Sequence, residues 1–141
     1  ERTEREKFAK LKIPGSMRHL IPDMPPDVDL VKNIQEAHSH PPGDLLWFYK
    51  KVRTGGPWDY KTQIDPKYEN FGNFHYGVVG TAQGIFEDTL LRGGGAAQLI
   101  RGTNKKEWGN PSWKPPYGDN PRDQYWIKKG IEFYKLLRKT L

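Results

Sequence analysis

The chain has 141 residues, which is the usual size of one domain and too short for two ordinary hydrophobic cores. It contains no cysteine and no long apolar run, which excludes disulfides, thiolate nucleophiles, cysteine-based metal sites and a transmembrane helix. The net charge of +6 favours an anionic partner: a nucleic acid, an acidic cell-wall polymer, a membrane surface or an acidic protein.

The first 26 residues are expected to be a lead-in that connects the domain to an upstream carrier. The chain opens with the charged segment ERTEREKFAK, which can form a helix but has little to bury. Residues 14–26 contain four prolines and are predicted to be extended. From residue 27 to residue 141 we expect a single folded domain.

Two helices are predicted in the first part of this domain from their capping residues. Asp27 or Asp29 begins the first, which ends at the Pro-Pro-Gly break of residues 41–43. Asp44 begins the second, which ends at Gly-Gly-Pro of residues 55–57. Both segments carry apolar residues at three- and four-residue spacing, so each is expected to bury one face.

The middle of the chain, residues 57–76, has neither a helical nor an alternating period and is predicted to be an ordered loop, with room for a short hairpin. A third helix is predicted from Glu87 through the glycine run 93–95, and a last helix from Asn120, with Pro121 at its first position. Because β-branched residues are sparse, the fold class is mainly α, a compact helical domain with long ordered loops rich in Pro, Gly and aromatic residues.

The densest group of reactive side chains falls in the irregular stretch of residues 57–76. Glu69 and His75 are candidate proton-transfer groups, because a carboxylate and an imidazole held together can exchange protons near neutral pH, and Lys61 can neutralise developing negative charge. We expect these side chains and Asp59 to share one cavity. In the alternative interpretation, His75 is a hydrogen-bonded structural residue and Glu69 only pairs with a cation.

Other arrangements that carry chemistry are weak or absent in the sequence. His38 and His40 lack the spacing that places two imidazoles on one helical face, and a surface turn is favoured over a metal site. Neither a phosphate-binding GxxxxGK[ST] loop nor a GxSxG nucleophile elbow is present. No metal and no cofactor is expected.

Several segments, in order, carry a family resemblance. They are GPWDYK at residues 56–61, YENFGNFHYG at 68–77, GxxxG at 80–84, LLR at 90–92 with the following Ala-Gln at 97–98, and PPYGDNPRD at 115–123. Together they resemble the polymorphic toxin type 44 family over residues 29–134. The resemblance implies a C-terminal toxin domain of secreted bacterial proteins, including those with Rhs repeats, which is delivered into competing bacteria and is neutralised by a cognate immunity protein, expected to be acidic.

The site residues follow from these segments and from the residue types within them. The expected catalytic residues are Asp59, Lys61, Glu69 and His75. The expected substrate-binding residues are Trp58, Tyr60, Asn73, Tyr76, Arg92, Gln98 and Asp119.

Three functions remain open at this point. The first is a metal-independent ribonuclease acting on RNA in the target cytoplasm, with His75, Glu69 and Lys61 as its chemistry and aromatic side chains for base stacking. The alternative is a peptidoglycan glycosidase acting in the periplasm, because NFHYGVVGTAQG is similar to the NYNYG-x-x-G-x-A-x-G segment of plant-type chitinases, and Glu36 with Glu69 would supply two carboxylates. A non-enzymatic binding module, built on the basic last helix and exposed tryptophans, is the third.

Overall fold

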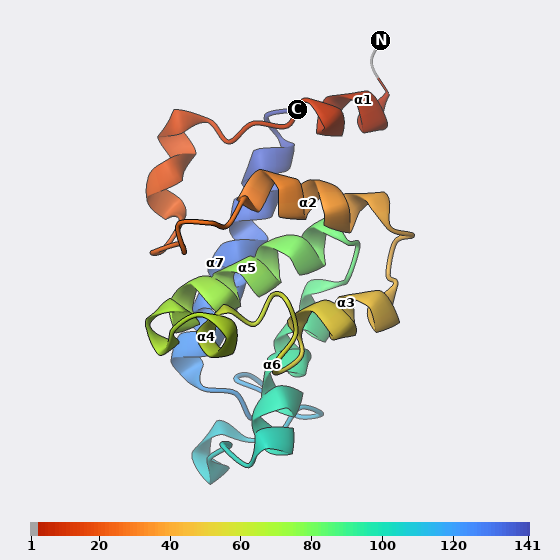
Figure 1. Ribbon diagram of the computed structural model, residues 1–141. Helices are drawn as coiled ribbons and strands as arrows, with labels where there is room; N and C mark the ends of the chain where they lie inside the picture. The colour runs from red at the N-terminus through yellow and green to blue at the C-terminus, as the bar shows by residue number, and fades with distance from the viewer. Residues whose placement is uncertain (1–2) are drawn as a thin grey trace.

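The computed structural model describes residues 3–141, except for the side chains of residues 96 and 98–101. It is a mainly α domain, as predicted, and its described residues contain no strand. Figure 1 shows the arrangement of the helices. Within the described part of the chain, no helix combines the length and the apolar character needed to cross a membrane. The α-helices are α1 (Glu4–Ala9), α2 (Leu30–Ser39), α3 (Leu45–Val52), α4 (Tyr60–Gln63), α5 (Glu69–Ala82), α6 (Glu87–Arg101) and α7 (Pro121–Arg138), and short 3-10 helices span Gly15–Leu20, Pro66–Tyr68 and Lys106–Trp108.

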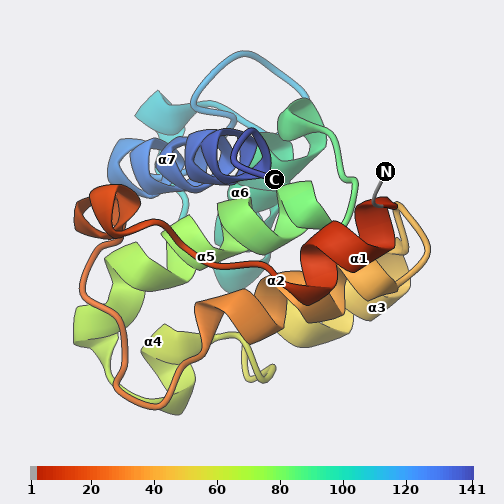
Figure 2. The same cartoon turned by 90° about the horizontal axis from the view of Figure 1, so that it is seen from above.

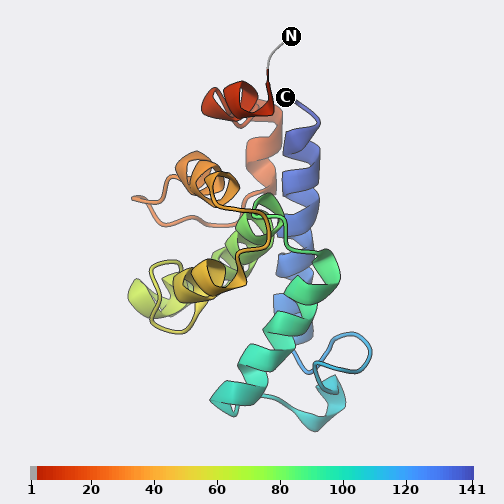
Figure 3. The same cartoon turned by 90° about the vertical axis from the view of Figure 1, so that its right-hand side faces the viewer.

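The centre of the fold is the packing of α5 against α7. The two backbones approach so closely that a Cβ atom on Gly77 would collide with the carbonyl of Ile127, and one on Gly130 with the carbonyl of Phe74. Glycine at these two helical positions therefore permits a contact that any side chain would block. α2 packs on α5 from the side opposite to the α6 contact, as the views in Figures 2 and 3 show.

Three of the predicted helix starts are confirmed by their caps. The side chains of Asp29, Asp44 and Asn120 accept hydrogen bonds from backbone amides in the first turns of α2, α3 and α7, at 3.0, 3.2 and 2.9 Å. Pro121 occupies the first position of α7, as predicted. Local capping chemistry thus fixes where these helices begin.

The prediction of a loop over residues 57–76 is wrong for most of its length. α4 and a 3-10 helix fall within it, and α5 begins at Glu69. α5 is buried on several sides, so apolar and small residues occupy most of its positions and no amphipathic period is visible in the sequence. The site residues at 69–76 therefore lie on a helix and not on a loop.

The described part of the predicted lead-in packs on the rest of the domain. Phe8, Leu11, Ile13 and Met17 are all buried, and Gln35 on α2 donates a hydrogen bond to the backbone carbonyl of Phe8 at 2.9 Å. α1 lies beside the C-terminal end of α7, where an ion pair joins the two helices (Figures 1 and 3). This segment therefore contributes to the hydrophobic core.

Candidate active site

A pocket of about 380 Å³ opens between α3, α4, α5, α6 and the start of α7. α3 supplies an apolar wall that includes Leu45, Phe48 and Tyr49, and the glycine-rich part of α6 also lines the pocket. The polar side chains gather where the first turns of α5 and α7 meet. Three carboxyl groups line the pocket there, from Glu69, Asp119 and Asp123, and we refer to these three as the carboxyl cluster.

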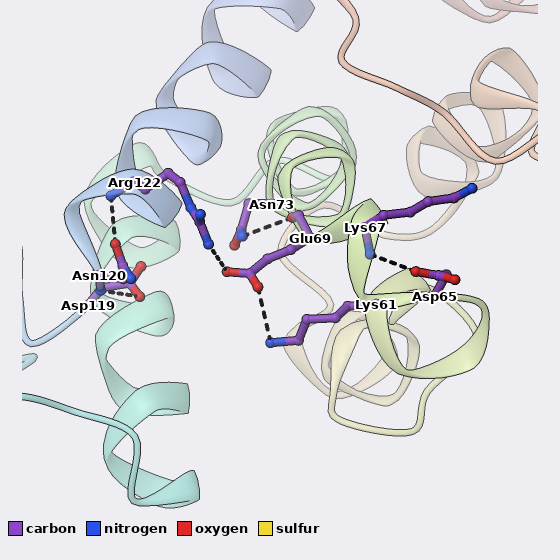
Figure 4. Close-up of polar contacts among 8 residues, drawn as sticks. All are labelled: Lys61, Asp65, Lys67, Glu69, Asn73, Asp119, Asn120 and Arg122. Atoms are coloured by element: carbon purple, nitrogen blue, oxygen red, sulfur yellow. Dashed lines mark hydrogen bonds and ion pairs between the residues drawn. The ribbon is translucent and has the colours of Figure 1, made fainter.

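Glu69 is the first residue of α5, and two cations hold its carboxylate. Its Oε2 accepts a hydrogen bond from Arg122 at 2.9 Å, and its Oε1 lies 3.9 Å from Lys61 Nζ (Figure 4). Partial burial alone would raise the pKa of Glu69, but hydrogen bonds with Asp123 and Arg122 and the charge of Lys61 outweigh it and lower that pKa. Glu69 is therefore ionised at neutral pH.

Asp123 occupies the third position of α7 and is only 7% exposed. Burial, its hydrogen bond with the Glu69 carboxylate and the nearby charge of Asp119 raise the pKa of Asp123 to about 7. Below about pH 7 the two carboxyl groups therefore hold one proton between them, and the raised pKa of Asp123 favours that residue as its site. A pair with pKa values displaced in opposite directions is the arrangement from which acid and base roles are assigned.

Asp119, predicted as a substrate contact, lies just before α7 and is 2% exposed. Its Oδ2 accepts a hydrogen bond from Gln124 Nε2 at 2.7 Å, and its Oδ1 accepts one from the backbone amide of Asn120 at 2.8 Å. Gln124 Nε2 also donates to the carbonyl of Leu91 on α6 at 3.0 Å. The carboxylate is thus fixed between α6 and α7.

His75 lies in the core and does not line the pocket. Its Nε2 is 3.1 Å from the side-chain amide of Asn33, which also donates to the hydroxyl of Tyr60 at 3.1 Å. Trp58 and Phe71 pack around the imidazole ring. Complete burial lowers the pKa of His75 to about 3, so the ring is neutral and is separated from any ligand in the pocket.

The other residues predicted on and around α4 do line the pocket. Trp58, Asp59, Tyr60 and Lys61 all contribute to its wall. Asp59 Oδ2 accepts a hydrogen bond from the backbone amide of Gly55 at 2.8 Å, which ties the preceding turn to α4. Burial raises the pKa of Tyr60, which therefore stays protonated.

On α5, Asn73 and Tyr76 also line the pocket, as predicted for substrate contacts. Asn73 donates to the backbone carbonyl of Glu69 at 3.1 Å, one turn earlier. Tyr76 donates its hydroxyl hydrogen to the carbonyl of Leu90 at 2.8 Å and thereby links α5 to α6. Its ring forms part of the wall beside the carboxyl cluster.

Three predicted residues lie elsewhere or are not described. Arg92 does not line the pocket: its Nη1 donates to backbone carbonyls of the 102–120 loop at 2.7 and 2.9 Å, and its Nε pairs with Asp88. Glu36, the candidate second carboxylate, is outside the pocket and pairs with Lys51 at 2.8 Å. The side chain of Gln98 lies outside the described residues.

Sequence reasoning did not single out Asp123 or Arg122 as site residues. Both fall in the PPYGDNPRD segment, but an acidic residue in a first helical turn is common and has an ordinary structural explanation, so the sequence does not mark Asp123 as a site residue. Only the packing of α7 on α5 brings Asp123 to Glu69, 54 residues earlier in the chain. In the described part of the chain, no group of three His, Asp or Glu side chains is arranged to hold a metal ion.

Comparison with known protein families identifies a match. The sequence pattern of the family described as Bacterial toxin 44 matches residues 63–136, a segment that contains the whole carboxyl cluster. No curated protein and no solved structure matches the chain. The match covers more than half of the chain and agrees with the resemblance carried by the separate sequence segments. The chain therefore belongs to the bacterial toxin 44 family.

Proposed function

We propose that this toxin domain is a hydrolase that cleaves glycosidic bonds of the bacterial cell wall, with Glu69 and Asp123 as its catalytic residues. The observation that carries the proposal is the pair itself: two hydrogen-bonded carboxyl groups that line a pocket of about 380 Å³, with the pKa of Glu69 lowered and that of Asp123 raised. Glycoside hydrolysis requires one carboxylic acid and one carboxylate on either side of the scissile bond, about 5 Å or more apart. The hydrogen bond between Glu69 and Asp123 must therefore open when the substrate enters.

The chemistry of each group follows from its protonation state. Asp123 donates its proton to the glycosidic oxygen as the bond from that oxygen to the anomeric carbon breaks. Glu69 stabilises the positive charge on the sugar ring and accepts a proton from the water whose oxygen bonds to the anomeric carbon. After the products leave, the hydrogen bond between the two carboxyl groups offers a direct route for that proton to return from Glu69 to Asp123.

The surroundings of the pair favour a sugar over a phosphodiester. Asp119 adds a further carboxyl group beside Glu69 and Asp123, and its negative charge disfavours a phosphate at this end of the pocket. The apolar wall of α3 and the ring of Tyr76 suit the flat apolar faces of sugar rings. His75, which the ribonuclease mechanism used as its base, is buried and neutral.

The test is digestion of purified peptidoglycan sacculi by the isolated domain, followed by mass spectrometry of the released fragments. Fragments with new reducing ends are expected. Glu69→Gln and Asp123→Asn should each lower the rate by about 100-fold or more, whereas Glu107→Gln, an exposed carboxylate outside the pocket, should leave it unchanged. Intact sacculi with a folded, lethal domain would rule the proposal out, and full toxicity of folded Glu69→Gln would favour a non-enzymatic binding module.

A metal-independent ribonuclease is the second candidate, and one observation favours it. Arg53 and Lys61 line the pocket and Arg122 reaches Glu69, so cations are available to hold a phosphate while Glu69 removes a proton from a ribose 2'-hydroxyl. Degradation of total RNA by the purified domain in EDTA would establish this activity. Intact RNA under conditions where sacculi are cleaved would exclude it.

The biological setting is proposed from family membership. The domain acts as the toxic part of a secreted bacterial protein, is carried on upstream domains, and is used against competing bacteria. A cognate immunity protein protects the producer, and the net charge of +6 suits an acidic one. Co-expression of a candidate immunity protein should abolish killing and should form a complex with the purified domain.

A further inference from the structure

The turn that carries Asp119 has an uncommon backbone conformation, and hydrogen bonds fix its carboxylate. Tyr117 has a positive φ of 61°, a region that residues with a side chain seldom occupy. Asp119 follows two residues later with both of its oxygens engaged by donors. A conformation of this kind persists only where the surrounding structure holds it, and such sites are commonly functional.

The glycine run of α6 provides the room for this turn. A Cβ atom on Gly94 would collide with Oδ2 of Asp119, and one on Gly95 would collide with the carbonyl oxygen of Tyr117. Glycine inside a helix is less favourable than alanine. The glycines at residues 93–95 therefore lower the stability of α6, and they allow Asp119 to lie close against this helix.

The position of Asp119 matters because of what lies around Asp123. Glu69 and Asp119 are the two acidic groups that act on Asp123, while Arg122 acts in the opposite direction. Two like charges beside a carboxyl group favour its neutral, protonated form. Among the described side chains, the charged and titratable groups around the pocket are Tyr49 on α3 and Arg53 after it, Asp59, Tyr60 and Lys61 at α4, Glu69 and Tyr76 on α5, Asp119 in the turn and Arg122 on α7.

We propose that Asp119 is a positioning residue of the active site: its carboxylate, held by Gln124 in the space that the glycines of α6 leave open, keeps the proton on Asp123 and thereby maintains the general acid. This inference rests on the proposed function for its catalytic meaning. Asp119 itself is not assigned a proton transfer. Its contribution is electrostatic, and it depends on the carboxylate being held where it is.

The experiment measures the protonation of Asp123 directly, by carbon-13 NMR titration of the aspartate carboxyl signals, with Asp123→Asn used for assignment. In Asp119→Asn the titration midpoint of Asp123 is expected to fall by about one pH unit, and the alkaline limb of kcat/KM on soluble peptidoglycan fragments should shift in the same direction. Asp27→Asn makes the same change of charge at an exposed position away from the pocket and should shift neither.

A second variant covers the case in which Asp119→Asn does not fold. Gln124→Met removes the donor that holds Asp119 but leaves the charge of Asp119 in place, and the midpoint of Asp123 should again fall as the carboxylate relaxes away. Unchanged midpoints in the folded variants would overturn the inference. A lowered midpoint in a domain that cleaves no glycan would sustain the role of Asp119 and would contradict only the proposed function.

Discussion

The protonation of Asp123 couples the pH of the medium to the stability of the domain. The pKa of this carboxyl is about 7 in the folded state against an ordinary value of 3.8, so between these values the folded chain binds a proton that the unfolded chain does not. The free energy of unfolding should therefore decrease as pH rises from about 4 to 7. Asp123→Asn removes this dependence. From about pH 4 to about pH 7, the free energy of unfolding of this variant should therefore rise relative to that of the wild type by on the order of 2 kcal/mol. Urea unfolding of both proteins across this pH range measures the difference in their free energies of unfolding. The same pH dependence in both proteins would contradict the prediction.

His75 titrates in the opposite sense and should matter for stability rather than for catalysis. Its pKa is lowered to about 3 in the folded state. As pH falls below about 6.5, the unfolded chain therefore binds a proton that the folded chain does not bind, and the free energy of unfolding decreases down to about pH 3. His75→Gln should weaken this loss of stability at low pH. It should leave unchanged the fall of kcat/KM on the acidic side of its pH profile. Loss of that fall in a folded His75→Gln protein would make the imidazole a catalytic base after all.

For individual residues, the sequence could predict part of the site. Asp59, Lys61 and Glu69 stand close together in the chain, and their density alone indicated a shared pocket, which they do line. Asp123 could not be found in this way, because its partner lies far away in sequence and a carboxylate in a first helical turn has an ordinary structural explanation. The burial of His75 depends on Asn33, also distant in sequence, and no local pattern reports it.

Among the secondary-structure elements, the contact between α5 and α7 should be the least tolerant of change. Gly77→Ala or Gly130→Ala would push the two helix backbones apart, and each should lower the free energy of unfolding by about 3 kcal/mol or more. Gly72 is the matched control on α5: a Cβ atom there meets nothing within 4 Å, so Gly72→Ala should stabilise by up to about 1 kcal/mol. Equal effects at Gly77 and Gly72, measured by thermal unfolding, would refute this account of the contact.

The same contact explains which elements sequence could predict. α2, α3 and α7 are marked by caps and by one apolar face, and these signals are local. α5 has no side-chain cap, and its glycines, which read as helix-breaking in isolation, are used for close packing and burial. Sequence signals of this kind describe a helix that faces water on one side, and they fail for the helix at the centre of the molecule.

For the molecule as a whole, the N-terminal segment tests where the folding unit begins. Deletion of residues 1–26 removes four buried apolar side chains, from Phe8, Leu11, Ile13 and Met17, each of which contributes roughly 1.5–3 kcal/mol by burial. The truncated domain should unfold at a much lower temperature or lose cooperative unfolding. Deletion of residues 1–6 removes the exposed ion pair of Glu4 with Arg138 but none of these four side chains, and it should lower the melting temperature far less. An unchanged melting temperature after the longer deletion would show the segment to be a linker.

The target of the toxin can be decided at the scale of the cell, because the two candidate substrates lie in different compartments. If the Glu69 and Asp123 pair cleaves peptidoglycan, the domain should kill when a signal peptide directs it to the periplasm and should be tolerated in the cytoplasm, and Glu69→Gln should abolish the killing. Periplasmic expression should also cause cell rounding and lysis, because cutting the glycan strands weakens the wall that resists turgor pressure. Killing from the cytoplasm, with RNA degraded and cell shape retained, would instead identify a ribonuclease, in which the cations around Glu69 hold the phosphate and the carboxyl pair acts on the ribose and the leaving group.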